Sequence, residues 1–127
     1  MAAHNDLGKR GEQIAAKHLV SEGWYIRHCD WTMRGIDLDI VCIDEDSSIL
    51  VFVEVKTRTS DEFGRPSLAV DKVKRRNIIT ASEAYRHLFR LSNLPVRYDI
   101  ISIVGTPETG YSLEHMEDAF GIIDVIE

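Results

Sequence analysis

Three residues, Asp39, Glu54 and Lys56, have the types and spacing needed for chemistry on a divalent metal ion. Two carboxylates that face each other across a strand pair repel and destabilise it. A hard cation such as Mg²⁺ would compensate this repulsion, because it binds carboxylate, carbonyl and water oxygens. An ammonium group on the same face could hold a water nucleophile or stabilise charge as a phosphodiester is hydrolysed. A surface Glu–Lys ion pair without catalytic function is the alternative interpretation.

The elements that would position these residues form a β-hairpin. Residues 36–43 and 49–58 alternate in side-chain type, which predicts two strands, and the polar run 44–48 predicts a turn. The alternation places Asp37 and Asp39 on one face, opposite Ile36, Leu38, Ile40 and Cys42.

The register of this hairpin decides which carboxylates meet. A symmetric turn, with positions 44 and 49 paired, places Asp39 opposite Glu54 and Asp37 opposite Lys56. Lys56 lies two residues after Glu54 and therefore shares its face. We expect the carboxylates of Asp39 and Glu54 to reach one shared ion, with Lys56 beside them.

Two helices are predicted to flank the hairpin. The first begins at an N-cap at Asn5 or Asp6 and ends before Gly23, and the second spans about residues 71–90. Glu12 lies at the border of the first apolar face, and Lys74 lies within the second. The first face comprises Leu7, Gly11, Ile14, Ala15, His18 and Leu19, and the second comprises Val70, Val73, Ile78, Ala81, Tyr85 and Leu88.

Further strands complete an α-β-β-β-α-β order. Residues 24–30 predict a strand with Trp24, Ile26 and His28 on one side, and residues 59–66 predict a loop. A strand is expected over 96–104, with weaker candidates at 111–120 and 122–126. Arg97 and Asp99 are interpreted as a structural pair.

Composition and charge narrow the function classes. The 127 residues are 44% hydrophobic and 28% charged, which predicts one globular domain over residues 1–127. No apolar run approaches the roughly 20 residues of a membrane span, and the N-terminus does not resemble a signal peptide. Cys29 and Cys42 form no C-x-x-C motif, which favours reduced core residues in a cytoplasmic protein.

Charge is unevenly distributed along the chain. The net charge is −6, but residues 105–127 alone hold six acids and no Lys or Arg. Residues 36–50 hold five acids, and residues 54–76 hold seven bases against four acids. An acidic cluster beside a basic segment suits a metal site next to a phosphate-binding surface, although such segregation also arises by chance on solvated faces.

These residues resemble a known nuclease motif. Asp39 followed by Glu54-Val55-Lys56 resembles PD-(D/E)XK. Leu7–Ala16 resembles the Gly-x-x-Gly-Glu-x-x-Ala start of the YraN family of predicted endonucleases, and Val51–Arg58 resembles its Phe-Val-Glu-Val-Lys-x-Arg strand. The likeness extends over roughly residues 6–120 and includes Phe63-Gly64, Lys74-Arg75-Arg76 and Arg97-Tyr98-Asp99.

The resemblance implies a fold and an activity. The fold is a restriction-endonuclease-like three-layer α/β/α domain with a mixed central sheet. The activity is metal-dependent hydrolysis of DNA phosphodiester bonds, with branched DNA a candidate substrate because the family is related to archaeal Holliday junction resolvases. That kinship also suggests a homodimer.

The resemblance further implies roles for single residues. Asp39 and Glu54 would bind Mg²⁺ or Mn²⁺, Lys56 would position or activate water, and Glu12 would bind a second metal or its water. The family reads Gly-Glu-Ile-Asp-Leu-Ile where this chain reads Gly35-Ile36-Asp37-Leu38-Asp39-Ile40, so Asp37 is the second choice as ligand. The residues implied to contact the DNA backbone are Lys74, Arg75, Arg76 and Arg58.

Two other functions fit the same sequence. One is a non-catalytic nucleic-acid-binding module of the same fold, which would bind metal without cleaving DNA. The other is a protein-interaction domain whose partner docks on the acidic C-terminal tail, which would show no salt-sensitive affinity for nucleic acid.

Overall fold

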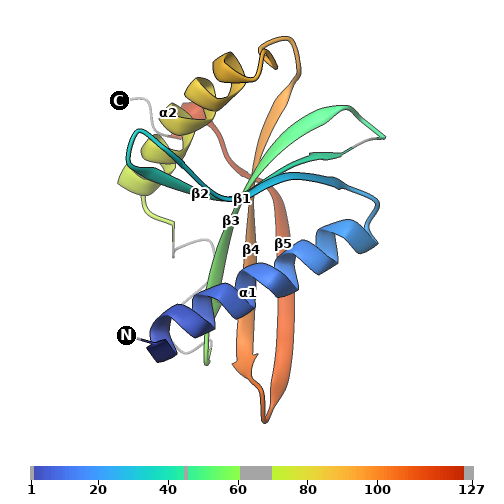
Figure 1. Cartoon of the computed structure of the whole chain (residues 1–127), viewed down its shortest axis with the longest axis vertical. Helices are drawn as coiled ribbons and strands as arrows, with labels where there is room; N and C mark the ends of the chain where they lie inside the picture. Colours follow the sequence, from blue (N-terminus) through green and yellow to red (C-terminus); the bar gives the residue numbers. More distant parts are fainter. Residues whose placement is uncertain (1, 45, 61–69, 125–127) are drawn as a thin grey trace.

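The sheet and two helices seen in Figure 1 follow the predicted order, and the weaker strand candidate at 111–120 is present as a fifth strand. This computed structural model describes residues 2–44, 46–60 and 70–124, with side chains from Leu7 onward. The elements are α1 (Ala2–Ser21), β1 (Tyr25–Met33), β2 (Ile36–Asp44), β3 (Ile49–Arg58), α2 (Lys72–Leu88), β4 (Val96–Thr106), β5 (Gly110–Phe120) and the 3₁₀ helix η2 (Ile122–Asp124).

The five strands form one mixed sheet in the order β1-β2-β3-β4-β5. β3 and β4 are parallel, and all other neighbours are antiparallel. A parallel pair needs a crossover, and α2 supplies it between β3 and β4. The helices pack on opposite faces of the sheet, as α1 crosses β3 and β4 while α2 lies beside the end of the β1–β2 hairpin (Figure 1). The predicted three-layer, restriction-endonuclease-like α/β/α fold is confirmed.

Each face of the sheet has its own apolar core. On the α1 face, Ala15 and Leu19 pack against Ile40, Cys42, Val51, Val53, Val55, Ile101 and Ile103. On the α2 face, Ile78, Ala81 and Tyr85 pack against Leu38, Val41, Leu50, Phe52, Tyr98, Ile100 and Phe120. Residues of β3 alternate between the two cores, as the pleat of a fully covered strand requires.

Gly11 sets how closely α1 approaches β3. A Cβ placed on Gly11 would lie 1.8 Å from the Thr57 hydroxyl oxygen, a distance that no side chain tolerates. Any other residue here would require the Thr57 side chain or the helix itself to shift. Because Glu12 is the next residue, this contact holds a carboxylate of α1 over the end of β3.

Helix boundaries and faces differ in places from the sequence prediction. The helix α1 begins at Ala2, so the predicted N-cap at Asn5 or Asp6 is wrong, since the alanines before them extend the helix. For α2, Asp71 caps the helix by accepting from the Lys74 N–H at 2.8 Å. Val73 and Leu88 were predicted in its apolar face, but they are 62% and 57% exposed, because the face follows Ile78, Ala81 and Tyr85.

β1 contains an irregularity that alternation cannot predict. The pairing with β2 shifts between Ile26 and His28, so that one extra residue bulges from the strand. Ile26 therefore packs on the α1 face, whereas His28 contacts Tyr85 on the α2 face. The prediction that Trp24, Ile26 and His28 share one side is wrong for this reason.

The cysteine, C-terminal strand, loop and membrane predictions have different outcomes. Cys42 is buried as predicted, but Cys29 is exposed rather than in the core. Residues 122–124 form a 3₁₀ helix instead of starting a strand, and residues 61–66 of the predicted loop lie outside the described residues. Within the described ranges, none of the helices combines the length and apolarity required to cross a membrane.

β4 and β5 carry a buried group of charged residues that is separate from Asp39, Glu54 and Lys56. Asp99 is fully buried, and its carboxylate accepts two hydrogen bonds from Arg97, at 2.9 and 3.0 Å. It also accepts from the Asp118 N–H at 3.0 Å, and His115 Nε2 lies 2.8 Å away. The Arg97 guanidinium lies 5.0 Å from the Trp24 ring. The predicted structural pair of Arg97 and Asp99 is thus the centre of a buried network.

Candidate active site

The candidate site forms where β2 separates from β3. The predicted register is confirmed at Val41–Phe52, but the ladder ends at Ile40–Val53, one pair before Asp39 and Glu54. Asp39 Oδ2 accepts the Val55 N–H at 2.9 Å, so a carboxylate takes the donor that a continued ladder would give to the β2 backbone. The strands can then diverge, and a polar opening forms between them.

The separation also changes which way β2 faces. Leu38 packs in the α2 core, whereas Ile40 packs in the α1 core, although the residues are two apart. Regular alternation would place both on one face, as the sequence predicted. The side chains of β2 therefore change faces at Asp39, the residue whose carboxylate accepts the hydrogen bond from the Val55 N–H.

Glu54 is the most buried carboxylate at the site. It is 4% exposed and lies on β3 opposite Ile100 of β4. Its Oε2 lies 2.7 Å from Lys74 Nζ and 3.8 Å from Lys56 Nζ. Two lysines from different elements thus share one carboxylate oxygen, and Lys74 makes the closer ion pair.

Three further carboxylates converge beside Glu54. Oxygens of Glu12, Asp30 and Asp39 all lie within 4.8 Å of one another, and they come from α1, β1 and β2. Glu12 reaches this point because Gly11 lets α1 approach β3 closely. Four separate elements therefore supply the acidic side chains of one small region.

Asp30 is the site residue that sequence reasoning missed. A two-residue turn, Arg34-Gly35, joins β1 to β2, with φ values of 53° and 77° at these positions. Positive φ at both positions is typical of the tight type I′ hairpin turn. The register that follows from this turn places Asp30 beside Asp39, so the Arg-Gly pair is the signal that could have found it.

The electrostatics of this cluster favour protons on its carboxylates when no cation is bound. Burial, followed by repulsion from Glu54 and Glu12, raises the pKa of Asp39 to about 8. Burial and repulsion from Asp30, Glu54 and Asp37 raise the pKa of Glu12 to about 7. Negative charge is therefore in excess here, even with Lys56 and Lys74 close by.

The two lysines respond in opposite directions. Burial and the nearby charge of Lys74 lower the pKa of Lys56, more than the carboxylates raise it. Burial also acts to lower the pKa of Lys74, but its close contact with Glu54 outweighs burial and raises it. Lys56 is thus the amine that loses its proton more readily.

The donor set suits a hard divalent cation. Every converging group is a carboxylate, with no thiolate or imidazole among those of the cluster, and such oxygen sets favour Mg²⁺ or Mn²⁺ over softer metals. A cation would also remove the repulsion that raises the pKa of Asp39. The cluster of Glu12, Asp30 and Asp39 could therefore hold a metal ion.

Asp37, the second-choice ligand, lies apart from these three. It is exposed, and its Oδ1 accepts a hydrogen bond from the Thr32 hydroxyl at 2.9 Å. Asp37 instead lines a neighbouring cavity with Lys74. The structure thus groups Asp39, rather than Asp37, with Glu12 and Asp30.

The arginines predicted to contact DNA differ in their surroundings. Arg75 Nε donates to the Val70 carbonyl at 2.7 Å, and its guanidinium lies 5.5 Å from the Phe120 ring. Arg76 is exposed on α2, and Arg58 is half-buried at the end of β3. Arg75 thus ties α2 to the rest of the fold, whereas Arg76 lies at the surface.

Fold and site together define an α/β protein of restriction-endonuclease-like fold, with converging carboxylates suited to a divalent ion. The chain belongs to the uncharacterised protein family UPF0102, whose model matches residues 11–103. This is the YraN family that its motifs resemble.

Relatives with the name UPF0102 protein align along nearly the whole chain. One from Phocaeicola vulgatus is 45% identical over 120 residues, which cover 94% of this chain and 96% of the relative. One from Bacteroides thetaiotaomicron is 43% identical over 121 residues, with the same coverages. A third, from Porphyromonas gingivalis, is 42% identical over 124 residues and covers 97% of this chain and 90% of its own length.

Proposed function

We propose that this protein is a metal-dependent endonuclease that hydrolyses phosphodiester bonds of DNA. The observation that carries the proposal is the convergence of carboxylates from four elements beside two lysines, with the pKa of Asp39 raised to about 8 by burial and like charge. Such an arrangement is costly to a fold that does not use it, because buried like charges destabilise the native state.

Glu12, Asp30, Asp39 and Glu54 are the residues that would hold Mg²⁺ or Mn²⁺. A bound divalent ion supplies positive charge to the phosphate oxygens and lowers the pKa of water. Asp39 is held in place for this role, because the Val55 N–H donates to one of its oxygens. Glu12 and Asp30 complete the set from α1 and β1.

Lys56 acts on the attacking water and on the developing negative charge. Its ammonium group lies 3.8 Å from Glu54, and burial, together with the nearby charge of Lys74, lowers its pKa. A cation held at this point stabilises charge that builds up on the phosphate during attack.

Lys74 binds the phosphate group of the substrate. In the structure it makes the closer of the two lysine ion pairs of Glu54, at 2.7 Å. Once a metal ion balances the charge of Glu54, Lys74 can bind a phosphate oxygen in place of the carboxylate without leaving the site. Arg76 and Arg58 extend the positive surface along α2 and the end of β3, and they would contact neighbouring phosphates.

The decisive experiment compares cleavage by wild type and Lys56→Ala. Wild type is expected to cut plasmid or branched DNA in Mg²⁺ or Mn²⁺, and Lys56→Ala to be about 10² to 10³ times slower, the typical cost of one lost electrostatic contact in a transition state. Metal-dependent shifts in melting temperature should persist in Lys56→Ala, because the carboxylates remain.

Lys17→Ala is the matched control, since Lys17 is an exposed lysine of α1 outside the site. It should cut as fast as wild type. Equal rates for Lys56→Ala and wild type would contradict the proposal. DNA binding and metal-dependent melting without cleavage would instead identify a non-catalytic binding module.

A further inference from the structure

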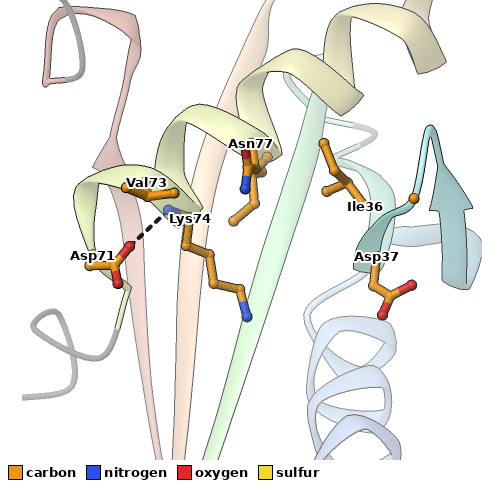
Figure 2. A pocket seen from close by; sticks show the side chains of 8 residues that line it. Ile36, Asp37, Asp71, Val73, Lys74 and Asn77 are labelled. Carbon is orange, nitrogen blue, oxygen red and sulfur yellow. Dashed lines mark hydrogen bonds between the residues drawn. The ribbon is translucent and has the colours of Figure 1, made fainter.

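A cavity of about 350 Å³ lies beside the carboxylates, between the start of α2 and the start of β2. Figure 2 shows Ile36 and Asp37 of β2 on one side of it, and Val73, Lys74 and Asn77 of α2 with the N-cap Asp71 on the other. This volume lies in the range of pockets that take small organic groups. The proposed metal binding and hydrolysis assign no role to this cavity.

The cavity is continuous with the candidate active site. Lys74 lines it, and the same side chain extends toward β3, where its Nζ lies 2.7 Å from Glu54 (Figure 2). Asp37 lines it as well and is close enough to Glu12 to repel its charge. A phosphate held by Lys74 would therefore place the attached nucleoside at the mouth of the cavity.

The lining combines aliphatic side chains and one amide with the charged side chains of Asp37, Asp71 and Lys74. Ile36, Val73 and Ile78 supply aliphatic surface, and Val73 is 62% exposed although it is a large apolar residue in the first turn of a helix. The exposed amide of Asn77 offers both a donor and an acceptor. Apolar faces with one paired donor and acceptor at the edge match a planar heterocycle such as a nucleobase.

We propose that this cavity binds one unstacked nucleobase of the DNA strand whose phosphate lies at Lys74. This inference rests on the proposed nuclease function and specifies its substrate class. A base inside a duplex is stacked and paired, so it cannot enter a recess between a helix and a strand. Extruding it costs a few kcal/mol, and least where the nucleotide is already unpaired. The substrate is therefore DNA with an unpaired nucleotide next to the cleaved bond.

The test measures base binding separately from cleavage. Oligonucleotides carry the fluorescent base 2-aminopurine at a single position, either unpaired at a junction or fully paired, and they bind in Ca²⁺ in place of Mg²⁺. The unpaired probe is expected to bind at least tenfold more tightly, with a fluorescence change confined to one position. The fully paired probe is expected to show no such change.

Two variants and one control locate the binding to the cavity. Asn77→Ala should weaken binding of the unpaired probe about tenfold, which corresponds to one hydrogen bond of the base edge. Val73→Trp should fill the cavity and abolish the position-specific fluorescence change, and the exposure of Val73 makes this substitution compatible with folding. Thr80→Ala, an exposed position one turn along α2 and outside the cavity, should change neither.

The outcomes separate this proposal from the nuclease itself. Equal affinity for paired and unpaired probes, or unchanged binding by both cavity variants, would overturn the base pocket even if the protein cleaves DNA. A position-specific signal that Asn77→Ala and Val73→Trp remove supports the pocket even if no cleavage occurs, and in that case only the nuclease proposal fails. Absence of any DNA binding would overturn both.

Discussion

Two regions of this molecule bury aspartates in opposite ways. Asp99 is fully buried, and Arg97, His115 and the Asp118 N–H all lie within hydrogen-bond distance of its carboxylate. Burial alone would raise its pKa, but these partners outweigh burial and lower it. Asp39 is half-buried and accepts one backbone hydrogen bond, while other carboxylates surround it and its pKa rises to about 8.

The difference shows which region depends on something from outside. The Asp99 network contains its own cation in Arg97, so its charge is balanced within the fold. The Asp39 region holds four carboxylates against two lysines, and those lysines are concentrated on Glu54. A region that is short of cations suits a site for a metal ion, whereas a balanced one serves stability.

The largest expected effect comes from matched substitutions of the two aspartates. Without divalent ions, Asp99→Asn should lower the free energy of unfolding by about 3 to 5 kcal/mol, because Arg97 loses its buried carboxylate and is left with the exposed Glu117, 3.7 Å away. Asp39→Asn should leave it unchanged to within about 1 kcal/mol, or raise it, because the neutral amide does not need the proton that folding forces onto the Asp39 carboxyl. Urea unfolding in EDTA measures both.

Adding Mg²⁺ to the same two variants tests the contrast between Asp39 and Asp99 a second time. With Mg²⁺ added, wild type should be stabilised, Asp99→Asn should gain a similar increment, and Asp39→Asn should gain little. Comparable destabilisation by both substitutions in EDTA would mean that Asp39 is as well partnered as Asp99, contrary to the geometry.

The pH dependence of stability should also differ between the regions. The pKa values of Asp39 and Glu12 rise to about 8 and about 7, so the folded state keeps protons that the unfolded state has lost. The free energy of unfolding without metal should therefore fall as the pH rises from about 5 to about 8. Asp99 has a lowered pKa, so it changes the free energy of unfolding only at pH values below the ordinary pKa of aspartate, outside this window.

Melting curves between pH 5 and pH 9, with and without Mg²⁺, measure this dependence. Metal binds the ionised carboxylates, so its stabilising effect should grow with pH and cancel the loss. Asp39→Asn should flatten the metal-free curve. A metal-free curve that rises through this window would contradict the raised pKa values.

A smaller effect is expected for Lys74→Met. Without metal, the free energy of unfolding should fall by about 1 kcal/mol, because Glu54 loses its closest partner while Lys74 itself is partly exposed to solvent. In Mg²⁺ the loss should shrink, and affinity for DNA should drop although affinity for Mg²⁺ does not. Lys17→Met should change none of these, and a fall in Mg²⁺ affinity for Lys74→Met would contradict the exchange proposed for this lysine.

The smallest effect concerns the surface charges. With two or three phosphate contacts from Lys74, Arg76 and Arg58, the logarithm of the DNA affinity should fall against the logarithm of salt with a slope of about −2 to −3. Arg76→Ala should reduce the slope by about 1, whereas Arg75→Ala should lower stability, because Arg75 binds the Val70 carbonyl. An affinity that does not depend on salt would contradict a DNA-binding surface and favour a protein partner.

The sequence alone determined the features that arise from local periodicity. The alternation of residues 49–58 places Glu54 and Lys56 on one face of a strand, because the pleat repeats every two residues. The polar turn and its symmetric register were likewise predictable, as were the helix capped by Asp71 and the pairing of Arg97 with Asp99, two residues apart on one strand. Each of these depends on residues close together in the chain.

Which distant groups meet depends on how the elements pack together. The ladder ends at Asp39 because a side chain competes for the Val55 N–H, and alternation contains no information about that competition. Asp30 joins the site through the β1–β2 register, and Glu12 joins it because Gly11 lets a helix approach the sheet. Lys74 pairs with Glu54 because α2 packs on the same sheet. Burial and like charge act on groups brought together by packing, so they have no signature in any single segment.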